Sequence, residues 1–531
     1  MDTIEIKKYN DVWLDNGLVN LFSIFKNIQE NNFEETILSD LKIFDDKIKF
    51  SFDDQEKLIK KLSKEIKAKR ENLILNVESK QEKKEIKKDF ILIQEGKKIQ
   101  GKVKLKENIY TPEKTELLLK EMFASMDSGN NKCTFCNRTF NKKFKKIQQA
   151  SYPFVTKIRS LSGVRSGDGI KLAEYFSDYC VLCYLSGILE WTDESLIYRS
   201  IPGKVSFLIL PNSNSLKYLR KIKKQYVNIL NNDARWCNIK VDIQKSNNEN
   251  EVESPYGKFS TLLSFYESFI ATAQEVVKKN EILWYIIEIP SGAVKNLKYY
   301  EINFEETILK LFNKAITKRH YIYRNFIKNF YAFNIDEKKS LRNFDEENEL
   351  REKLCEAIGN NNFHMFAMSF IPKKGYRIGM KKEAFETLET ILKIWRMGEM
   401  EEKEQDKFLK MIKESGRSLA KLIDNKLSLF FKLEKTKNKS EFFKVIQEIT
   451  RRLFIDKDKF LAGSYEKYEK EKKQAQEKGK EFKKKWINSY QIDALIECVQ
   501  DDQSSFQDIK NLILIYTSLN FGRNQTNKGE K

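Results

Sequence analysis

Two copies of a Cys-x-x-Cys motif constrain this chain more than any other feature of its sequence. Cys133 and Cys136 form the first copy, in "KCTFCN", and Cys180 and Cys183 form the second, in "CVLC". Random placement of the chain's 7 cysteines gives one such pair in roughly one chain in ten, and two pairs in well under one in a hundred. Two residues between thiolates let one tight turn present both sulfurs to a single ion, and two such turns complete a tetrahedral site. The sequence therefore predicts a four-cysteine site for a structural Zn²⁺.

The distance along the chain between the two pairs is the weak point of this interpretation. Residues 137–179 separate Cys136 from Cys180, whereas compact zinc ribbons use about 15–20 residues. A longer insert is tolerable because the cost of loop closure grows only logarithmically with length. A redox couple or an accidental pair would explain one motif, but a redox Cys-x-x-Cys needs no second copy. With thiolates in all four positions, no position remains for an activated water, so we expect the metal to be structural.

The composition indicates a folded, multidomain and basic protein. A chain of 531 residues is long enough for about two to four domains, and 40% hydrophobic residues can bury sizeable cores. Lys and Arg exceed Asp and Glu by 97 to 77, a net charge of +20, which suits a nucleic acid or an anionic membrane surface. Lysine is abundant throughout, however, and much of it is expected to be ordinary solvated surface.

The sequence also predicts a cytoplasmic location. The start, "MDTIEIKKYNDVWL", lacks the basic-then-apolar pattern of a signal peptide. No run approaches the ~18–20 apolar residues that a membrane helix needs. We therefore expect reduced thiols and no disulfide framework.

Three basic segments are candidates for contacts with a nucleic acid. The first lies between the cysteine pairs, the second is a basic amphipathic helix over 216–230, and the third is a pair of arginines in the C-terminal region, where Arg is scarce against the Lys background. Each has the alternative interpretation of a solvated surface. The candidate residues are Lys142, Lys143, Lys145, Lys146, Arg159, Arg165, Lys171, Arg220, Lys221, Lys223, Lys224, Arg451 and Arg452.

Hydrophobic periodicity predicts an α+β fold: a mixed α/β N-terminal region with an inserted four-cysteine zinc finger, followed by an all-helical C-terminal bundle. Helices are expected over 11–30, 54–88 (one or two, exposed), 216–230 and 258–279. Buried strands are expected over 205–210, 238–243, 282–290 and 363–372. The predicted parts are 1–130 (α/β), 131–200 (zinc finger), 201–379 (central α/β) and 380–531 (helical bundle).

Motifs for catalysis are missing from the sequence. The two histidines, His320 and His364, lie far from each other and from the cysteine pairs, and His364 is expected in a strand. There is no Walker motif, no Gly-x-Gly-x-x-Gly after a strand and no Gly-x-Ser-x-Gly. The sequence therefore predicts a protein that is not an enzyme.

Taken together, these features resemble the large subunit of type I-B CRISPR surveillance complexes (Cascade), in its zinc-finger-bearing subfamily. Four stretches carry the resemblance, and only the cysteine pairs are a specific motif. They are "DVWLDNGLVNLFSIF" (11–25), the pair "CTFC"/"CVLC", "EILWYIIEIPSG" (281–292), and the helical tail with "SGRSLAKLI" (415–423) and "KSEFFKVIQEITRRLF" (439–454).

The resemblance implies a non-catalytic function in antiviral defence. Such a subunit recognises the protospacer-adjacent motif (PAM) in target duplex DNA, aids unwinding and R-loop formation, and docks a helicase-nuclease, while guide pairing reads the target sequence. The implied partners are guide RNA, target DNA, the Cascade backbone subunits, the subunit that caps the 5′ handle and the small subunit, with no membrane. The region 380–531 would resemble that small subunit.

Two rival functions remain open at this level. A standalone zinc-stapled RNA- or DNA-binding protein would bind without partner subunits and need no PAM. An enzyme with unrecognised carboxylate chemistry would show turnover that depends on a divalent metal.

Overall fold

The chain divides into two compact units, Met1–Phe304 and Glu305–Lys531. The predicted boundaries after 130, 200 and 379 do not coincide with this division. The computed structural model describes residues 2–31, 37–74, 97–99, 102–104, 112–124, 129–141, 151–152, 180–193, 195–201, 205–232, 257–272, 282–289, 298–334, 342–371, 376–398, 400–423, 427–449, 473, 477, 499 and 506–521.

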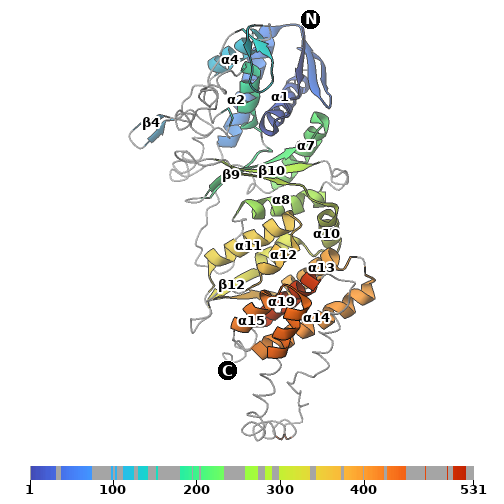
Figure 1. Ribbon diagram of the computed structural model, residues 1–531. Helices are drawn as coiled ribbons and strands as arrows, with labels where there is room; N and C mark the ends of the chain where they lie inside the picture. Colours follow the sequence, from blue (N-terminus) through green and yellow to red (C-terminus); the bar gives the residue numbers. More distant parts are fainter. Residues whose placement is uncertain are drawn as a thin grey trace. The chain divides into compact units, whose positions relative to one another are not determined.

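The first unit is a mixture of helices and antiparallel sheets (Figure 1). Its helices are α1 (Val12–Glu30), α2 (Gln55–Ile74), α4 (Pro112–Ala124), α6 (Val181–Glu190), α7 (Leu216–Asn232) and α8 (Lys258–Thr272). Its strands are β1 (Asp2–Lys7), β2 (Leu38–Ile43), β3 (Lys47–Phe52), β4 (Lys97–Ile99), β5 (Lys102–Lys104), β6 (Asn131–Lys132), β7 (Thr139–Phe140), β8 (Ile197–Ile201), β9 (Val205–Asn212), β10 (Leu283–Ile289) and β11 (Lys298–Ile302). The mixed α/β N-terminal region is thus confirmed.

Helix α1 is the centre of the first core. It starts where the Asp11 side chain accepts hydrogen bonds from the backbone N–H groups of Trp13 and Leu14, which satisfies two donors that the helix leaves unpaired. Apolar side chains are buried along most of its length, so its stability comes from packing on several sides. Gly17 lets α6 cross closely, because a Cβ at this position would lie 1.9 Å from the carbonyl oxygen of Ser186.

A four-stranded antiparallel sheet, in the order β11-β10-β9-β8, separates two groups of apolar side chains. Leu208 of β9 lies opposite Ile287 of β10, and both belong to the core around α1. On the other face, Trp284 packs edge-on against Phe265 of α8, with ring centroids 5.6 Å apart. Figure 1 shows α8 on one side of β9 and β10, with α1 and α7 on the other. Because successive side chains of a strand point to opposite faces, both strands carry apolar side chains on both faces, as expected for the buried strands that the sequence predicts.

The second unit is mostly helical, and it contains the predicted helical C-terminal region together with residues 305–379, which were predicted as part of the central α/β region. Its helices are α10 (Glu306–Thr317), α11 (Phe344–Gly359), α12 (Phe363–Met368), α13 (Lys382–Arg396), α14 (Glu402–Ile423), α15 (Leu427–Glu434) and α19 (Phe506–Phe521). It also contains a π-helical turn (Ile322–Phe326), a 3-10 turn (Ile327–Asn329), a helical stretch at 439–449 and the antiparallel pair β12 (Phe330–Asn334) and β13 (Tyr376–Met380). Gly416 permits the close packing of α14 on α19, since a Cβ there would lie 2.6 Å from the Cβ of Tyr516.

Two predicted elements differ from the structure. The strand predicted over 363–372 is wrong: Phe363–Met368 form helix α12, which the Asn362 side chain caps by accepting from the backbone N–H of Met365. His364 therefore lies in a helix. Helix α2 is less exposed than predicted, because Leu58 and Leu62 are fully buried.

The strand predicted over 238–243 lies outside the described residues. Among the residues that the structure does describe, no helix combines the length and apolar character needed to cross a bilayer.

Candidate metal centre

The first cysteine pair lies in a tight hairpin. Strands β6 and β7 pair antiparallel, with Lys132 opposite Thr139. Inside the hairpin, the backbone N–H of Cys133 donates to the carbonyl of Arg138 (2.8 Å), and that of Asn137 donates to the carbonyl of Cys133 (3.0 Å). Asn137 has a φ of 56°, in the left-handed region that Asn tolerates better than most residues. This turn brings the sulfurs of Cys133 and Cys136 to the same side.

The second cysteine pair lies at the start of a helix. Cys180 is the N-cap residue of α6, and Cys183 is in its first turn. The unpaired N–H groups at a helix N-terminus carry a partial positive charge, which favours thiolates there. The backbone N–H of Cys180 also points at the sulfur of Cys133, at 3.4 Å. The two pairs therefore meet through a backbone contact as well as through their sulfurs.

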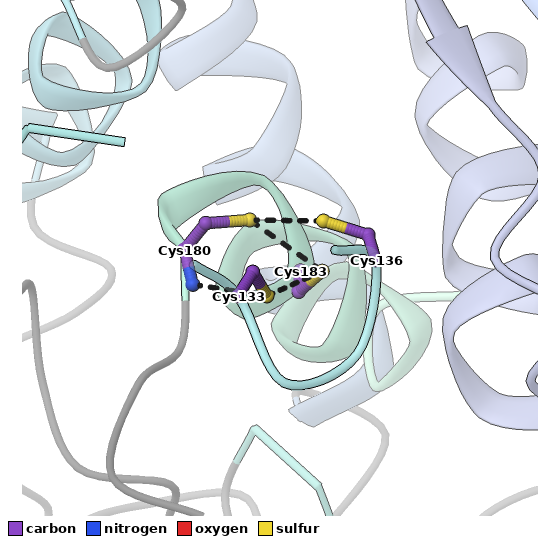
Figure 2. Close-up of side chains that lie close together, drawn as sticks. All are labelled: Cys133, Cys136, Cys180 and Cys183. Carbon is purple, nitrogen blue, oxygen red and sulfur yellow. Dashed lines mark hydrogen bonds between the residues drawn. The ribbon is translucent and has the colours of Figure 1, made fainter. Parts of the chain in front are cut away.

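All four sulfurs lie within 4.8 Å of one another. Figure 2 shows the four cysteine side chains pointing toward one another. The distance from Sγ to Sγ is 3.7 Å for Cys133–Cys183, 3.6 Å for Cys136–Cys180 and 3.5 Å for Cys180–Cys183. A tetrahedron with Zn–S bonds of ~2.3 Å has sulfur–sulfur edges of about 3.8 Å. A disulfide needs a sulfur–sulfur distance of about 2.05 Å, and no disulfide joins these four cysteines. The four cysteines can therefore bind a metal ion, as the spacing predicted.

Burial and mutual hydrogen bonding change the acidity of the four thiols. Hydrogen bonds from Cys136 and Cys180 lower the pKa of Cys133, whereas burial raises the pKa of Cys183 well above its ordinary value. The Tyr9 hydroxyl, whose pKa is raised by burial and then by Cys183 and Cys180, lies 3.2 Å from the Ser186 hydroxyl. Thiolates held this close together in a buried place repel each other, and a divalent cation removes that repulsion.

Aromatic side chains join the centre to helix α1. Phe135, inside the first cysteine turn, packs on Tyr152 with ring centroids 4.8 Å apart. The Tyr152 hydroxyl donates to Asp11, the residue that caps α1, at 2.7 Å. Trp13 donates its indole N–H to the carbonyls of Ser151 and Gly187, each at 3.0 Å. The cysteine cluster is thus part of the core of the first unit.

Those predicted nucleic-acid contacts that the structure describes all lie on helix α7. Lys221 and Lys224 are exposed, and Arg220 is partly buried. Lys223 does not belong to this basic face. It is 5% exposed and forms ion pairs of 2.8 Å with both Glu190 and Asp193.

Lys223 is therefore a buried structural residue and not a surface residue available to a nucleic acid, which corrects its place among the predicted contacts. It lies on the apolar side of α7, where the 3.6-residue period places it beside Leu219 and Ile222. Its ammonium binds the end of α6, the helix that carries Cys180 and Cys183. The other predicted contacts, Lys142, Lys143, Lys145, Lys146, Arg159, Arg165, Lys171, Arg451 and Arg452, lie outside the described residues.

Sequence reasoning missed the residues that support the centre. Asp11 is far from the cysteine motifs along the chain, Tyr152 lies in the insert between them, and Glu190 ends the helix that carries Cys183 in its first turn. None of the three carries a motif of its own. Only Asp11 has a recognisable signal, because an Asp before an apolar period of 3.6 residues marks the start of a helix.

Comparison with known proteins leaves the family open. No family model matches the sequence, and a search of curated proteins finds no significant match.

Proposed function

We propose that this chain is the large subunit of a type I CRISPR surveillance complex of the I-B class. In this proposal it is a non-catalytic cytoplasmic scaffold that recognises the PAM in duplex DNA, aids R-loop formation and docks the helicase-nuclease. Its partners would be guide RNA, target DNA, the backbone subunits, the subunit that caps the 5′ handle and the small subunit.

The observation that carries the proposal is the convergence of the two Cys-x-x-Cys pairs. Their sulfurs lie 3.5–3.7 Å apart along three edges of the cluster, which fits Zn²⁺ with four thiolate ligands. Cys133, Cys136, Cys180 and Cys183 would hold the ion, and its role would be to join a hairpin and a helix. A long insert between two such pairs is the specific motif of the subfamily that the sequence resembles.

The other stretches of the resemblance lie on elements that build the cores. Residues 11–25 belong to α1, residues 281–292 include the inner strand β10, and residues 415–423 lie in α14. The net charge of +20 supports a polyanionic partner. These observations support the proposal.

The deciding experiment is purification of the tagged protein from its native operon. Bound RNA would be sequenced, partner proteins identified and zinc quantified by mass spectrometry. We expect guide RNAs, partner subunits and one zinc ion per chain.

A lone protein that carries no guide RNA would overturn the complex assignment. Zinc together with unrelated RNA or DNA would then favour a standalone zinc-stapled nucleic-acid-binding protein. Turnover that requires an added divalent metal would contradict a non-catalytic role.

A further inference from the structure

A basic pocket lies in the first unit, away from the cysteine cluster. Its volume is about 340 Å³, at the small end of the ~300–1,000 Å³ range of ligand sites. Three elements converge on it: the C-terminal half of α1, the end of β2 and the first turn of α7. Among the described residues that line it there is no carboxylate, but there are four cationic side chains: Lys26, Lys42, Lys217 and Arg220. The site therefore favours an anionic group.

The turn after β2 and the start of α7 are tied together, so the pocket has a defined wall. The backbone N–H of Leu216 donates to the carbonyl of Asp45 at 2.9 Å, and the Ser215 hydroxyl donates to the Asp45 carboxylate. The Ser215 hydroxyl in turn accepts from the backbone N–H of Tyr218 at 3.0 Å, which caps α7. The positive end of the α7 dipole thus lies beside Lys217 and adds to the field in the pocket.

One hydrogen-bond donor of the Arg220 guanidinium has no acceptor among the described residues. Its guanidinium lies over the ring of Phe22, 4.6 Å from the centroid, so the ring fixes its plane. Its Nε is buried and has no hydrogen-bond partner among the described residues. Burial lowers the pKa of Arg220, because desolvation disfavours the charged form. A phosphate bound in the pocket would accept hydrogen bonds from the guanidinium and offset this loss of solvation.

The remaining cations are held loosely enough to bind an incoming phosphate. Lys26 pairs with Glu30 at 3.1 Å and Lys42 with Asp40 at 3.5 Å, and all four side chains are at least 36% exposed. Exposed pairs of this kind contribute little to stability and exchange readily. Lys217 is exposed and takes part in no ion pair with a described residue.

An aromatic side chain at the rim distinguishes this pocket from a plain phosphate site. Phe44 lines the pocket and is 39% exposed, so part of its ring is accessible to a ligand. Aromatic rings beside a basic groove are the usual platforms on which unstacked bases stack. A duplex keeps its bases stacked inside, and so it offers no base to a concave pocket of this size.

We propose that this pocket binds one nucleotide of a single-stranded nucleic acid, with the phosphate at Arg220 and Lys217 and the base on Phe44. The inference deepens the nucleic-acid-binding part of the proposed function and rests on it. It identifies a part of the first unit where a strand released from a duplex, or an unpaired end of RNA, is held.

The test measures binding of fluorescent single strands, oligouridylate and oligothymidylate, to the purified full chain loaded with zinc. Arg220→Gln should weaken binding by about tenfold or more, and Phe44→Ala by roughly 5- to 100-fold, as for other base-stacking aromatics. Lys217→Gln should reduce the slope of log affinity against log salt by about 0.7, the loss of one phosphate contact on a single strand.

Matched controls separate the pocket from general charge and aromatic effects. Lys60→Gln removes an exposed lysine of α2, and Tyr299→Ala removes a ring of β11 that is 58% exposed. Both controls should bind as the wild type does. An abasic strand of equal length should bind to the wild type more weakly than the strand with bases and be insensitive to Phe44→Ala.

Three results would overturn the proposal. They are equal losses in pocket and control variants, equal affinity for the abasic strand, and no single-strand binding by the wild type. Failure of the pocket is distinguishable from failure of the complex assignment. If the wild type co-purifies with guide RNA but the pocket variants bind single strands as tightly as the wild type does, the pocket proposal fails and the complex assignment stands. If the pocket variants lose single-strand binding but the wild type carries no guide RNA, the complex assignment fails and the pocket proposal stands.

Discussion

Among single residues, the four cysteines of the cluster are distinguished by the contacts that their sulfurs make with one another. Cys133, Cys180 and Cys183 are at most 1% exposed, whereas Cys136 is half-buried. The sulfurs contact one another, and the sulfur of Cys133 also accepts from the backbone N–H of Cys180. Removing one ligand therefore affects the other three.

We expect Cys183→Ser to remove the metal and to lower the free energy of unfolding by about 3 kcal/mol or more, because structural metal binding is coupled to folding. The measurements are zinc content by mass spectrometry and the midpoint of urea unfolding. Cys355→Ser is the matched control, since Cys355 is also buried but lies in the second unit. A variant that keeps stoichiometric zinc would contradict the four-thiolate site.

Asp15 is a buried carboxylate whose charge costs stability at neutral pH. Burial raises its pKa from 3.8 to about 6, against the opposing effect of Lys8. Between these two values the folded protein binds more protons than the unfolded chain, so stability falls as the pH rises through this window. Asp15→Asn should raise the free energy of unfolding by about 3 kcal/mol at pH 8 and by roughly half that at pH 5.

Urea unfolding of wild type and Asp15→Asn at the two pH values checks this prediction. The amide oxygen of Asn can still accept from the backbone N–H of Tyr9, which lies 2.7 Å from Asp15 Oδ1. A gain that is the same at both pH values would show that the pKa of Asp15 is not raised.

At the scale of elements, ion pairs and close packing hold the helices around the metal centre. The buried ammonium of Lys223 joins α7 to the end of α6, where it contacts Glu190 and Asp193, and it also donates to the carbonyl of Asn16 in α1 (3.2 Å). Gly187 lets α6 approach the chain at Ser151, since a Cβ there would lie 1.9 Å from the Ser151 carbonyl oxygen.

Lys223→Met should destabilise the first unit by about 3–5 kcal/mol, because it leaves two buried carboxylates without a partner. Lys221→Met, on the exposed side of the same helix, should change stability by no more than about 0.5 kcal/mol. Thermal or urea unfolding of both variants makes the comparison. If both variants lose equally little stability, Lys223 is a residue of the basic surface of α7 and not of a buried ion-pair cluster.

Elements with a strong period could be predicted from the sequence, and short apolar runs could not. The apolar stripe of α1 and the continuous apolar runs of β9 and β10 match the structure because burial on one or both sides imposes those patterns. Strand β9 extends one residue beyond Pro211. Strand β8 pairs with β9 only as far as Ile209, so Pro211 has one neighbouring strand, an edge position that proline tolerates. The run 363–372 is short and apolar apart from His364 and Ser369. Phe366 packs against the rings of Phe326, Phe370 and Trp395, and periodicity cannot separate so short a buried helix from a strand.

The candidate metal site could be predicted because the spacing of the two cysteines within each pair is visible in the sequence. The pocket could not, because Phe22, Phe44 and Arg220 come from three elements and no local pattern connects them. Only packing brings such residues together.

For the whole molecule, the division at Phe304 makes the helical part larger than the sequence indicated. Trp395 of α13 packs on Phe363 and Phe366 of α12, with ring centroids 5.6 and 5.2 Å away. The Ser518 hydroxyl of α19 donates to the carbonyl of Phe370. A fragment that starts at 380 loses these partners.

We therefore expect the fragment 305–531 to unfold in one cooperative transition and the fragment 380–531 to melt at a lower temperature with a broader transition. Circular dichroism during heating checks this prediction. Equal melting of the two fragments would place the boundary at 380, as the sequence alone suggested.

The net charge of +20 predicts a polyelectrolyte contribution to any nucleic-acid binding. Reversing the charges of Lys142, Lys143, Lys145 and Lys146 should weaken binding and flatten its salt dependence, by up to about 0.9 in slope for each duplex phosphate contact. Affinities at several salt concentrations give the slope. Reversal at exposed Lys60, Lys403, Lys407 and Lys410 is the control, and equal slopes in the two sets would assign the first four lysines to solvent.

The cysteine cluster also determines how this chain can tolerate change in length. Residues 137–179 leave the cluster at Cys136 and return to it at Cys180, whose sulfurs are 3.6 Å apart. Both ends of the segment are therefore anchored at one point, and doubling its length would cost only about 0.6 kcal/mol of closure entropy. An insertion between Tyr152 and Cys180 leaves in place the contacts of Ser151 with Trp13 and of Tyr152 with Asp11, so we expect a longer loop to be tolerated there without redesign of the core.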